Sequence, residues 1–193
     1  VDAYYAWLGL TWLQAVEVPI NTDYQGEWLI HAINTAHARL IVTSRRFLQS
    51  LTLVADQLKY VGIVVIFDAQ PGDERGALSA FFRIITPQEF FHDAEPAYDL
   101  TEPQVWDPMS VVFTSGTTGR AKAVVLPWGM EEAQRLVYGP EFRESVLYGY
   151  WPPFHTLGKS LLFIAAAWNG SLVTRERFSI SDFWDDVRTY GCT

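Results

Sequence analysis

The sequence predicts an α/β fold built on a mostly parallel β-sheet. Segments with helical spacing of apolar residues alternate along the chain with short apolar segments rich in β-branched residues, and this alternation is typical of parallel α/β domains. Residues 60–67 form a continuous apolar run, as expected of a strand in a parallel sheet that is covered on both faces. With 193 residues and 49% hydrophobic content, the chain is long enough and apolar enough to bury a sizeable core.

The first half of the chain carries this alternation most clearly. Residues 4–15 are predicted to form a buried helix rather than a membrane span, because polar residues and Pro19 interrupt the apolar stretch. An acidic, proline-rich stretch at 87–108 is predicted to be a linker across the surface. Between these segments we expect helices at 25–36 and 45–58 and strands at 16–21, 38–43 and 60–67.

In the second half, two β-rich runs at 110–114 and 123–126 flank a glycine-containing loop and are predicted to pair as a hairpin. Asn169 and Gly170 give a C-terminal signal to a helix at 156–168. A Ser/Asp cap and Gly191 mark the ends of a helix at 179–190. The remaining predicted elements are a helix at 131–138 and strands at 146–150 and 171–174.

The overall charge and the cysteine content exclude some classes of protein. The formal net charge of −8 argues against a nucleic-acid partner, because binding to phosphate backbones needs a basic face. A lone Cys192 cannot form an intrachain disulfide and fits a reducing compartment, so we expect a cytoplasmic protein without a transmembrane span. The chain begins at Val1 and stops at Thr193, where a further strand would be expected, and we therefore expect a fragment of a longer protein.

The loop from Ser115 to Lys122 is the strongest candidate for a binding site. Its glycines let the backbone approach a polyanion and adopt positive φ. Successive N–H groups in such a loop form an anion-binding concavity, and hydroxyl groups and Lys122 add donors and a positive charge. The spacing departs from both the Walker A motif and Gly-x-Gly-x-x-Gly. The sequence therefore predicts a phosphate-binding loop, and a Gly/Ser/Thr-rich turn with a solvated lysine is the open alternative.

The pattern Ser-Gly-Thr-Thr-Gly-x-x-Lys at 115–122 resembles the phosphate loop of the adenylate-forming superfamily, which includes acyl-CoA synthetases, luciferases and peptide-synthetase adenylation domains. Residues 18–21, Val-Pro-Ile-Asn, and residues 151–155, Trp-Pro-Pro-Phe-His, are similar to further motifs of acyl-CoA synthetases. Residues 176–187 look like the crotonobetaine/carnitine-CoA ligase-like branch. One departure is Ala121, which stands where many members have proline.

This resemblance implies that residues 1–193 are an incomplete N-terminal AMP-binding domain, with a mostly parallel sheet covered by helices on both faces. Residues from about 1 to 145 would form a first α/β subdomain, with the phosphate loop at 114–122 as a hairpin. Residues from about 146 to 193 would start a second subdomain and its sheet. The family's small C-terminal domain and its catalytic lysine are absent from the sequence, so we expect residues 1–193 alone to be inactive.

The resemblance also implies the activity of an AMP-forming acid–thiol ligase, an acyl-CoA synthetase. ATP with Mg²⁺ would activate a carboxylic acid, fatty or carnitine-like, as an acyl-adenylate with release of pyrophosphate, and the acyl group would then pass to coenzyme A. An amino-acid-activating adenylation domain and a noncatalytic nucleotide-binding module of the same fold remain open as alternatives. The oligomeric state is not predicted.

The candidate site residues come from the same motifs. Lys122, Thr118 and His155 are the candidate catalytic residues, and Thr118 is the candidate neighbour of Mg²⁺, for which no ligand can be named. The Pro-Phe-His motif assigns His155 to the acyl pocket or the adenylate site. The alternative is a histidine whose hydrogen bonds serve only the fold. The phosphates of ATP would be held by Thr114, Ser115, Gly116, Thr117, Thr118, Gly119 and Lys122.

Overall fold

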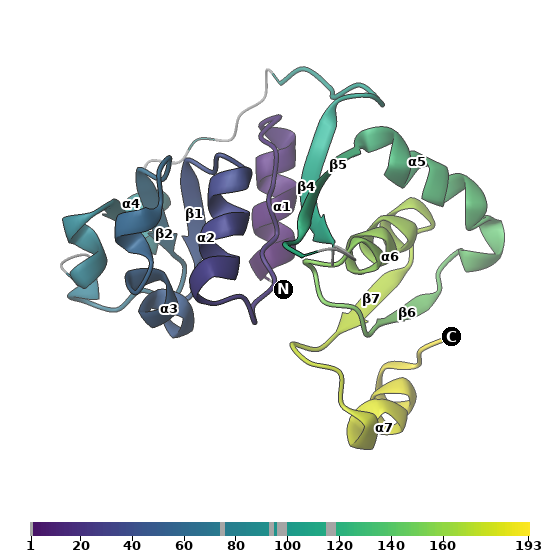
Figure 1. The fold of residues 1–193 in the computed structure, drawn as a ribbon. Helices are drawn as coiled ribbons and strands as arrows, with labels where there is room; N and C mark the ends of the chain where they lie inside the picture. The colour runs from purple at the N-terminus through teal and green to yellow at the C-terminus, as the bar shows by residue number, and fades with distance from the viewer. Residues whose placement is uncertain (1, 74–75, 93–94, 96–99, 115–118) are drawn as a thin grey trace. The chain divides into compact units, whose positions relative to one another are not determined.

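The computed structural model describes residues 2–73, 76–92, 95, 100–114 and 119–193 (Figure 1). Contacts group the chain into two compact units, each discontinuous in sequence. The first unit contains Val1–Pro19, Thr101–Val112 and Val125–Thr193, and the second contains Ile20–Leu100 and Phe113–Val124. The predicted subdomain boundary near residue 145 stays a prediction, and each unit is described by itself.

The second unit is built on a three-stranded parallel sheet with the order β1-β2-β3. The strands are β1 (Leu40–Thr43), β2 (Ile63–Ile66) and β3 (Arg83–Ile85). Leu40 lies opposite Ile63, which in turn lies opposite Arg83. The three residues that follow Ile63 in β2 are all buried, so the apolar run at 60–67 correctly predicted a central parallel strand.

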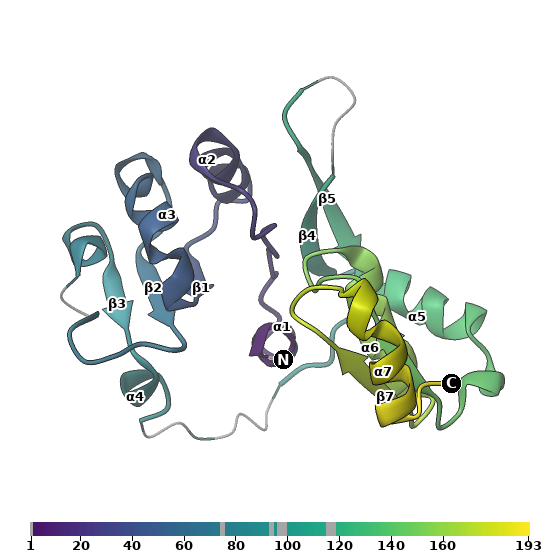
Figure 2. The same cartoon turned by 90° about the horizontal axis from the view of Figure 1, so that it is seen from below.

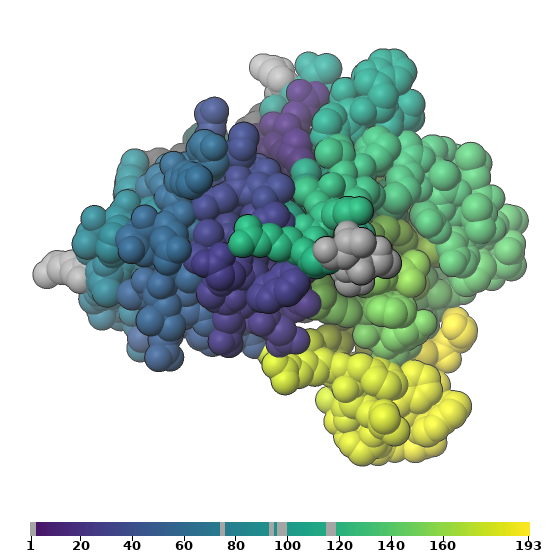
Figure 3. Space-filling view, in the orientation of Figure 1, coloured from purple at the N-terminus to yellow at the C-terminus, as the bar shows by residue number. Residues whose placement is uncertain are grey.

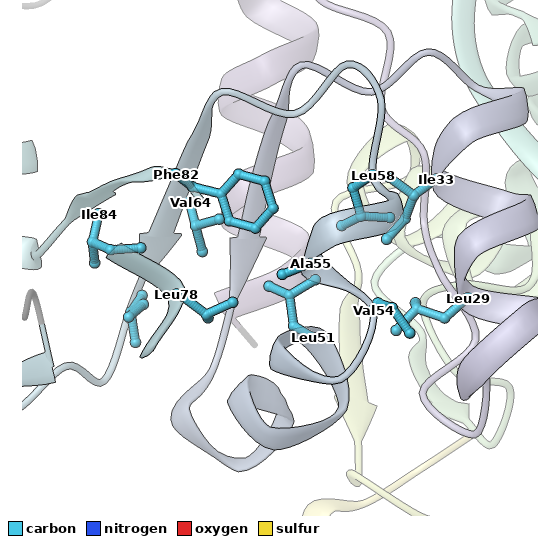
Figure 4. Close-up of a cluster of buried hydrophobic side chains, with 11 residues drawn as sticks. Leu29, Ile33, Leu51, Val54, Ala55, Leu58, Val64, Leu78, Phe82 and Ile84 are labelled. Atoms are coloured by element: carbon cyan, nitrogen blue, oxygen red, sulfur yellow. The ribbon is translucent and has the colours of Figure 1, made fainter. Parts of the chain in front are cut away.

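Helices α2 (Gly26–Thr35) and α3 (Leu48–Thr52) lie along one side of this sheet (Figure 2). Leu29 and Ile33, one turn apart on α2, and Leu51 of α3 belong to one buried cluster with Val64 and Ile84 of the sheet (Figure 4). Truncation of one such side chain to alanine costs roughly 2–5 kcal/mol of stability. This core holds α2 firmly against the sheet.

The predicted helix at 45–58 is wrong as a continuous element. Short 3₁₀ turns at Arg45–Phe47 and Ala55–Gln57 replace its two ends, and only α3 is α-helical. Asp68 accepts hydrogen bonds from the Ser44 hydroxyl (2.8 Å) and the Arg45 backbone N–H (2.6 Å), which tie the start of the segment to the loop after β2. Asn34 of α2 binds the backbone after α3, at the Gln57 carbonyl and the Lys59 N–H (both 2.9 Å). These long-range bonds outweigh the helical pattern.

Two further predictions of local structure need correction. The stretch at 87–108 begins with a short helix, α4 (Pro87–Phe90), in which Pro87 occupies a first-turn position that its fixed φ suits. The predicted strand at 16–21 is reduced to a single parallel bridge between Glu17 and Ser110. The sequence also did not predict β3, because a three-residue strand is too short to show a pattern.

The first unit contains α1 (Asp2–Trp12), α5 (Trp128–Val137), α6 (Thr156–Ala167), α7 (Ile180–Tyr190), β6 (Val146–Gly149) and β7 (Ser171–Thr174). Strands β6 and β7 are parallel, with Val146 opposite Ser171, and α6 connects them. Two further strands, β4 (Pro108–Thr114) and β5 (Lys122–Pro127), pair with each other, and the ends that flank residues 115–121 belong to the second unit. The predicted α/β class, with parallel pairing and a two-strand hairpin, is confirmed.

The core of the first unit joins α1 to this pair of strands. Tyr4 and Trp7 of α1 are buried in one cluster with Met109, Val112 and Leu126 of β4 and β5. The opposite side of α1 is exposed at Tyr5, Leu8 and Trp12, so the prediction that this helix is buried holds for one face only. None of the helices in the described part of the chain is long and apolar enough to cross a membrane.

The predicted C-terminal ends of α6 and α7 are confirmed, whereas α1 ends three residues before its predicted end and α5 begins three residues before its predicted start. Asn169, just beyond α6, adopts the left-handed conformation (φ +54°), and the Gly170 N–H donates to the Ala165 carbonyl at 2.7 Å. A β-carbon at Gly170 would lie 2.5 Å from the Ser145 carbonyl oxygen, so only glycine fits. Helix α7 ends at Gly191 (φ +62°), and Ser179 occupies its N-cap position without a side-chain capping bond.

Candidate functional site

The predicted phosphate loop is described at its two ends. Ser115, Gly116, Thr117 and Thr118 lie outside the described residues, and so does any metal position beside Thr118. Thr114 is the exposed last residue of β4, and Gly119 to Lys122 lead into β5. No group of three or more His, Cys, Asp or Glu side chains that could hold a metal ion occurs among the residues that are described.

Gly119 adopts a backbone conformation that the loop prediction requires of a glycine. Its φ is +136°, a region that residues with a β-carbon rarely enter. Apart from its chain neighbours, no residue that the structure describes has an atom within 4 Å of the position where a β-carbon would be, so packing against these residues does not explain the glycine. The backbone itself requires glycine here, and its open surroundings leave room for a close approach by a ligand.

Lys122 is the first residue of β5, and it is exposed. Within the described ranges, its ammonium group forms no ion pair or hydrogen bond with another side chain. Arg120 is different, because its guanidinium lies 3.6 Å from the Glu27 carboxylate of α2, with both side chains about 70% exposed. An ion pair that is this exposed contributes little stability. Lys122 is therefore the more available cation for an anionic ligand.

The exit of the loop is attached to α2. Ala121 is only 3% exposed, and its backbone carbonyl accepts a hydrogen bond from His31 Nε2 at 2.8 Å. The ring of Phe113, just before the end of β4, meets the His31 ring edge-on, with centroids 6.2 Å apart. The segment that begins at Gly119, green in Figure 3, lies over α2. The sequence did not point to His31, since nothing local distinguishes it from other polar residues of an amphipathic helix.

A shallow groove of about 400 Å³ opens beside this attachment in the second unit. Its lining joins α2 to the residues after α3 and to the loop exit, through Glu27, His31, Asn34, Lys59 and Arg120. Apart from Ile30, the described residues that line the groove are polar or charged, and the charged groups are of both signs, from Glu27, Lys59 and Arg120.

His155 lies in the first unit as the N-cap residue of α6. Its Nδ1 accepts a hydrogen bond from the Leu157 backbone N–H at 3.2 Å, so the proton of the neutral ring is on Nε2. The imidazole stacks on the Trp151 indole, with centroids 4.4 Å apart and planes 21° apart. The structure therefore gives His155, an exposed residue, a capping role, and its Nε2–H has no hydrogen-bond partner among the residues described.

A buried ionic cluster lies one turn further along α6. The Lys159 side chain is 1% exposed and forms an ion pair with Glu17, which is 14% exposed. Ser110 donates to the same carboxylate at 3.3 Å, and the ammonium lies 3.9 Å above the Trp7 ring. Burial lowers the pKa of Lys159 and raises the pKa of Glu17, and the attraction between the two groups opposes both shifts.

Glu131 of α5 adds a second buried carboxylate to this cluster. It is 1% exposed, and neither of its carboxylate oxygens has a hydrogen-bond partner among the described residues. Burial raises the pKa of Glu131, while the nearby Ser160 hydroxyl and Lys159 ammonium lower it. The sequence analysis missed this cluster, although a lysine within the apolar stretch of α6 was a signal that could have found it.

Residues 1–193 match the protein-family model described as AMP-binding enzyme over their whole length. The chain belongs to the AMP-binding enzyme family. Among curated relatives, long-chain fatty acid transport protein 5 of Homo sapiens is 28% identical over 203 residues, which cover 100% of this chain and 28% of that protein. Crotonobetaine/carnitine–CoA ligase of Citrobacter koseri is 29% identical over 200 residues, which cover 100% of this chain and 37% of that protein. The chain thus spans about a third of the length of these relatives.

Solved structures support the same fold. The anthranilate CoA ligase AuaEII in complex with anthranoyl-AMP aligns with a TM-score of 0.83 at 17% identity, over 97% of this chain and 36% of that one. ATP-bound MatB from Rhodopseudomonas palustris aligns with a TM-score of 0.73 at 22% identity, over 97% and 35%. At these identities the likeness establishes the fold alone, and the match to the AMP-binding enzyme family confirms the predicted resemblance.

Proposed function

We propose that this chain works in an ATP-dependent acyl-CoA ligase that forms AMP. The observation that carries the proposal is the match of all 193 residues to the AMP-binding enzyme family. Relatives named as CoA ligases and a fold shared with an anthranoyl-AMP complex support it. The glycine conformation at 119 and the exposed Lys122 fit a phosphate loop.

The proposed reaction has two steps. A carboxylate is a poor acyl donor, so one of its oxygens first attacks the α-phosphorus of ATP, and the bond between the α-phosphorus and the bridging oxygen breaks as pyrophosphate leaves. The sulfur of coenzyme A then attacks the acyl carbonyl carbon, and AMP leaves with the bonding electron pair. The thiol proton passes to the surrounding water or a base. The first step develops negative charge on the departing phosphates, and stabilisation of that charge is the main task of the protein.

In this proposal, Lys122 donates a charge-assisted hydrogen bond to the departing phosphates. Gly119, together with Gly116, lets the loop backbone approach them, and the hydroxyls of Thr114, Ser115, Thr117 and Thr118 orient their oxygens. Mg²⁺ bound with ATP would supply additional charge neutralisation near Thr118. These roles remain predictions for the residues that lie outside the described part of the chain.

His155 is proposed to serve the acyl acid rather than ATP. His155 is an exposed residue and its Nδ1 is occupied by the helix cap, so Nε2–H is the donor that the neutral ring can offer. We propose a fatty or carnitine-like carboxylic acid as the substrate class, because the relatives carry names of both kinds. The cytoplasmic location and the roles of coenzyme A and Mg²⁺ likewise stay predictions.

The decisive experiment incubates the protein at its natural length with ATP, Mg²⁺, coenzyme A and a panel of fatty acids, carnitine-like acids and amino acids. We expect AMP and acyl-CoA to form in equal amounts with one or more of the fatty or carnitine-like acids. Adenylation of amino acids alone would favour an adenylation domain. ATP binding without acid-dependent pyrophosphate exchange would identify a noncatalytic module and refute the ligase.

A further inference from the structure

We propose that helix α2 fixes the exit of the phosphate loop, with His31 as a positioning residue for Lys122. Two side chains one turn apart on α2, Glu27 and His31, contact consecutive residues of the loop exit, Arg120 and Ala121. All four residues belong to the second unit, so this contact lies within one compact body.

The His31 hydrogen bond has a defined direction. A backbone carbonyl can only accept, so His31 Nε2 must carry the proton that Ala121 receives at 2.8 Å. In the neutral ring Nδ1 is then an acceptor, and the Thr35 hydroxyl lies 3.3 Å from it. Thr35, four residues further along α2, thus supports the tautomer that the loop requires.

The bond acts on Lys122 through the peptide plane. The Ala121 carbonyl and the Lys122 backbone nitrogen belong to one planar peptide group, so a fixed carbonyl fixes the direction in which the Lys122 α-carbon leaves. Ala121 is buried while Lys122 is exposed, as expected if one residue anchors the strand and the next faces a ligand. His31 also packs against Phe113, and it therefore contacts the chain on both sides of residues 114–120.

The contribution of Glu27 should be smaller than that of His31. The Glu27–Arg120 pair is exposed to solvent on both sides, and such pairs are screened by water and salt. Glu27→Gln therefore serves as the matched control, since it changes the same face of α2 without removing the carbonyl bond.

The first test is structural and does not depend on the proposed function. Trypsin cleaves after Arg120 and Lys122, which flank the anchored carbonyl. In the protein at its natural length, we expect His31→Leu to speed cleavage at these two bonds by roughly 2- to 10-fold, the range that one neutral hydrogen bond supports. His31→Gln, whose side-chain amide keeps an N–H donor, should stay within about twofold of wild type, as should Glu27→Gln. Cleavage after Arg83 in β3, which belongs to the same unit as His31, reports general unfolding of that unit.

The second test rests on the proposed function. We expect His31→Leu to raise KM for ATP by roughly 2- to 10-fold with KM for the acid unchanged, and His31→Gln to restore KM for ATP.

The outcomes of the two tests are separable. If His31→Leu is cleaved faster than wild type at Arg120 and Lys122 but the wild-type protein has no ligase activity, the anchoring role is supported and the ligase is refuted. Equal cleavage in wild type, His31→Leu and His31→Gln would overturn the inference. If His31→Leu unfolds, wild-type cleavage and KM in His31→Gln support the inference, and a loose loop in that variant overturns it.

Discussion

Replacement of Lys159 by methionine removes the ammonium group from a buried ion pair while keeping an unbranched side chain of similar length. Loss of one partner of a buried pair costs about 3–5 kcal/mol, because the other charge is left without compensation. Glu17 retains the Ser110 hydrogen bond and some contact with solvent, so we expect the lower end, about 3 kcal/mol. For a chain of this size that loss corresponds to a fall in Tm of roughly 6–12 °C.

Tryptophan fluorescence during urea denaturation is a suitable assay. Every tryptophan except Trp28 belongs to the first unit, and Trp7 lies directly beneath the Lys159 ammonium. The signal therefore reports on the unit that the substitution perturbs, which matters because two units need not unfold together.

The matched control is the double variant Glu17→Gln/Lys159→Met, which leaves no uncompensated charge at the pair. We expect it to recover more than half of the stability that the single variant loses. A Lys159→Met protein within about 1 kcal/mol of wild type would show that the ammonium is not held in a buried pair, and would refute the reasoning.

Three further predictions concern single residues. Burial raises the folded-state pKa of Glu131, so the stability that this group contributes is full below its ordinary pKa and is lost as pH rises through the raised pKa. The free energy of unfolding of Glu131→Gln should therefore increase relative to that of wild type as pH rises. Denaturation measured from pH 4 to 9 checks this. Gly119→Ala should impose about 1–3 kcal/mol of backbone strain on the loop and reduce kcat/KM for ATP, with little change in global unfolding. His155→Ala should lose about 0.5–2 kcal/mol of stability through the lost cap, whereas His155→Asn should keep the cap; both should impair kcat/KM for the acid.

Each of these predictions has a contradictory outcome. Equal pH dependence in wild type and Glu131→Gln would show that Glu131 does not titrate differently on folding. Wild-type ATP kinetics in Gly119→Ala would remove the need for positive φ at this position. Normal acid kinetics in a stable His155→Asn would leave His155 as a helix cap alone.

The sequence predicted correctly those secondary-structure elements that depend on the properties of a few consecutive residues. The continuous apolar run gave β2, and Asn169-Gly170 marked the end of α6, because both depend on burial or backbone conformation at those residues. The helix expected at 45–58 failed because Asp68 and Asn34, distant in sequence, capture its terminal backbone groups. Periodicity carries no information about such partners.

In the candidate site, too, features that depend on local sequence were predictable and contacts between distant residues were not. The need for glycine at 119 and the exposure of Lys122 were predictable from the loop motif. His31 was not, because its partner, the Ala121 carbonyl, lies 90 residues away in the chain. Lys159 and Glu17 are separated by 142 residues, so only the fold reveals that each compensates the charge of the other.

The most direct test of the phosphate-loop assignment is acid-dependent ATP–pyrophosphate exchange by Lys122→Ala in the protein at its natural length, with Arg120→Ala as the matched control. A charge-assisted hydrogen bond contributes roughly 1.5–3 kcal/mol, so we expect kcat/KM for ATP to fall about 10- to 150-fold in Lys122→Ala while KM for the acid stays within about twofold. Arg120→Ala should change kcat/KM for ATP by less than about threefold, because Arg120 is exposed and faces Glu27. Wild-type ATP kinetics in Lys122→Ala would contradict the assignment of residues 114–122 to the phosphates of ATP.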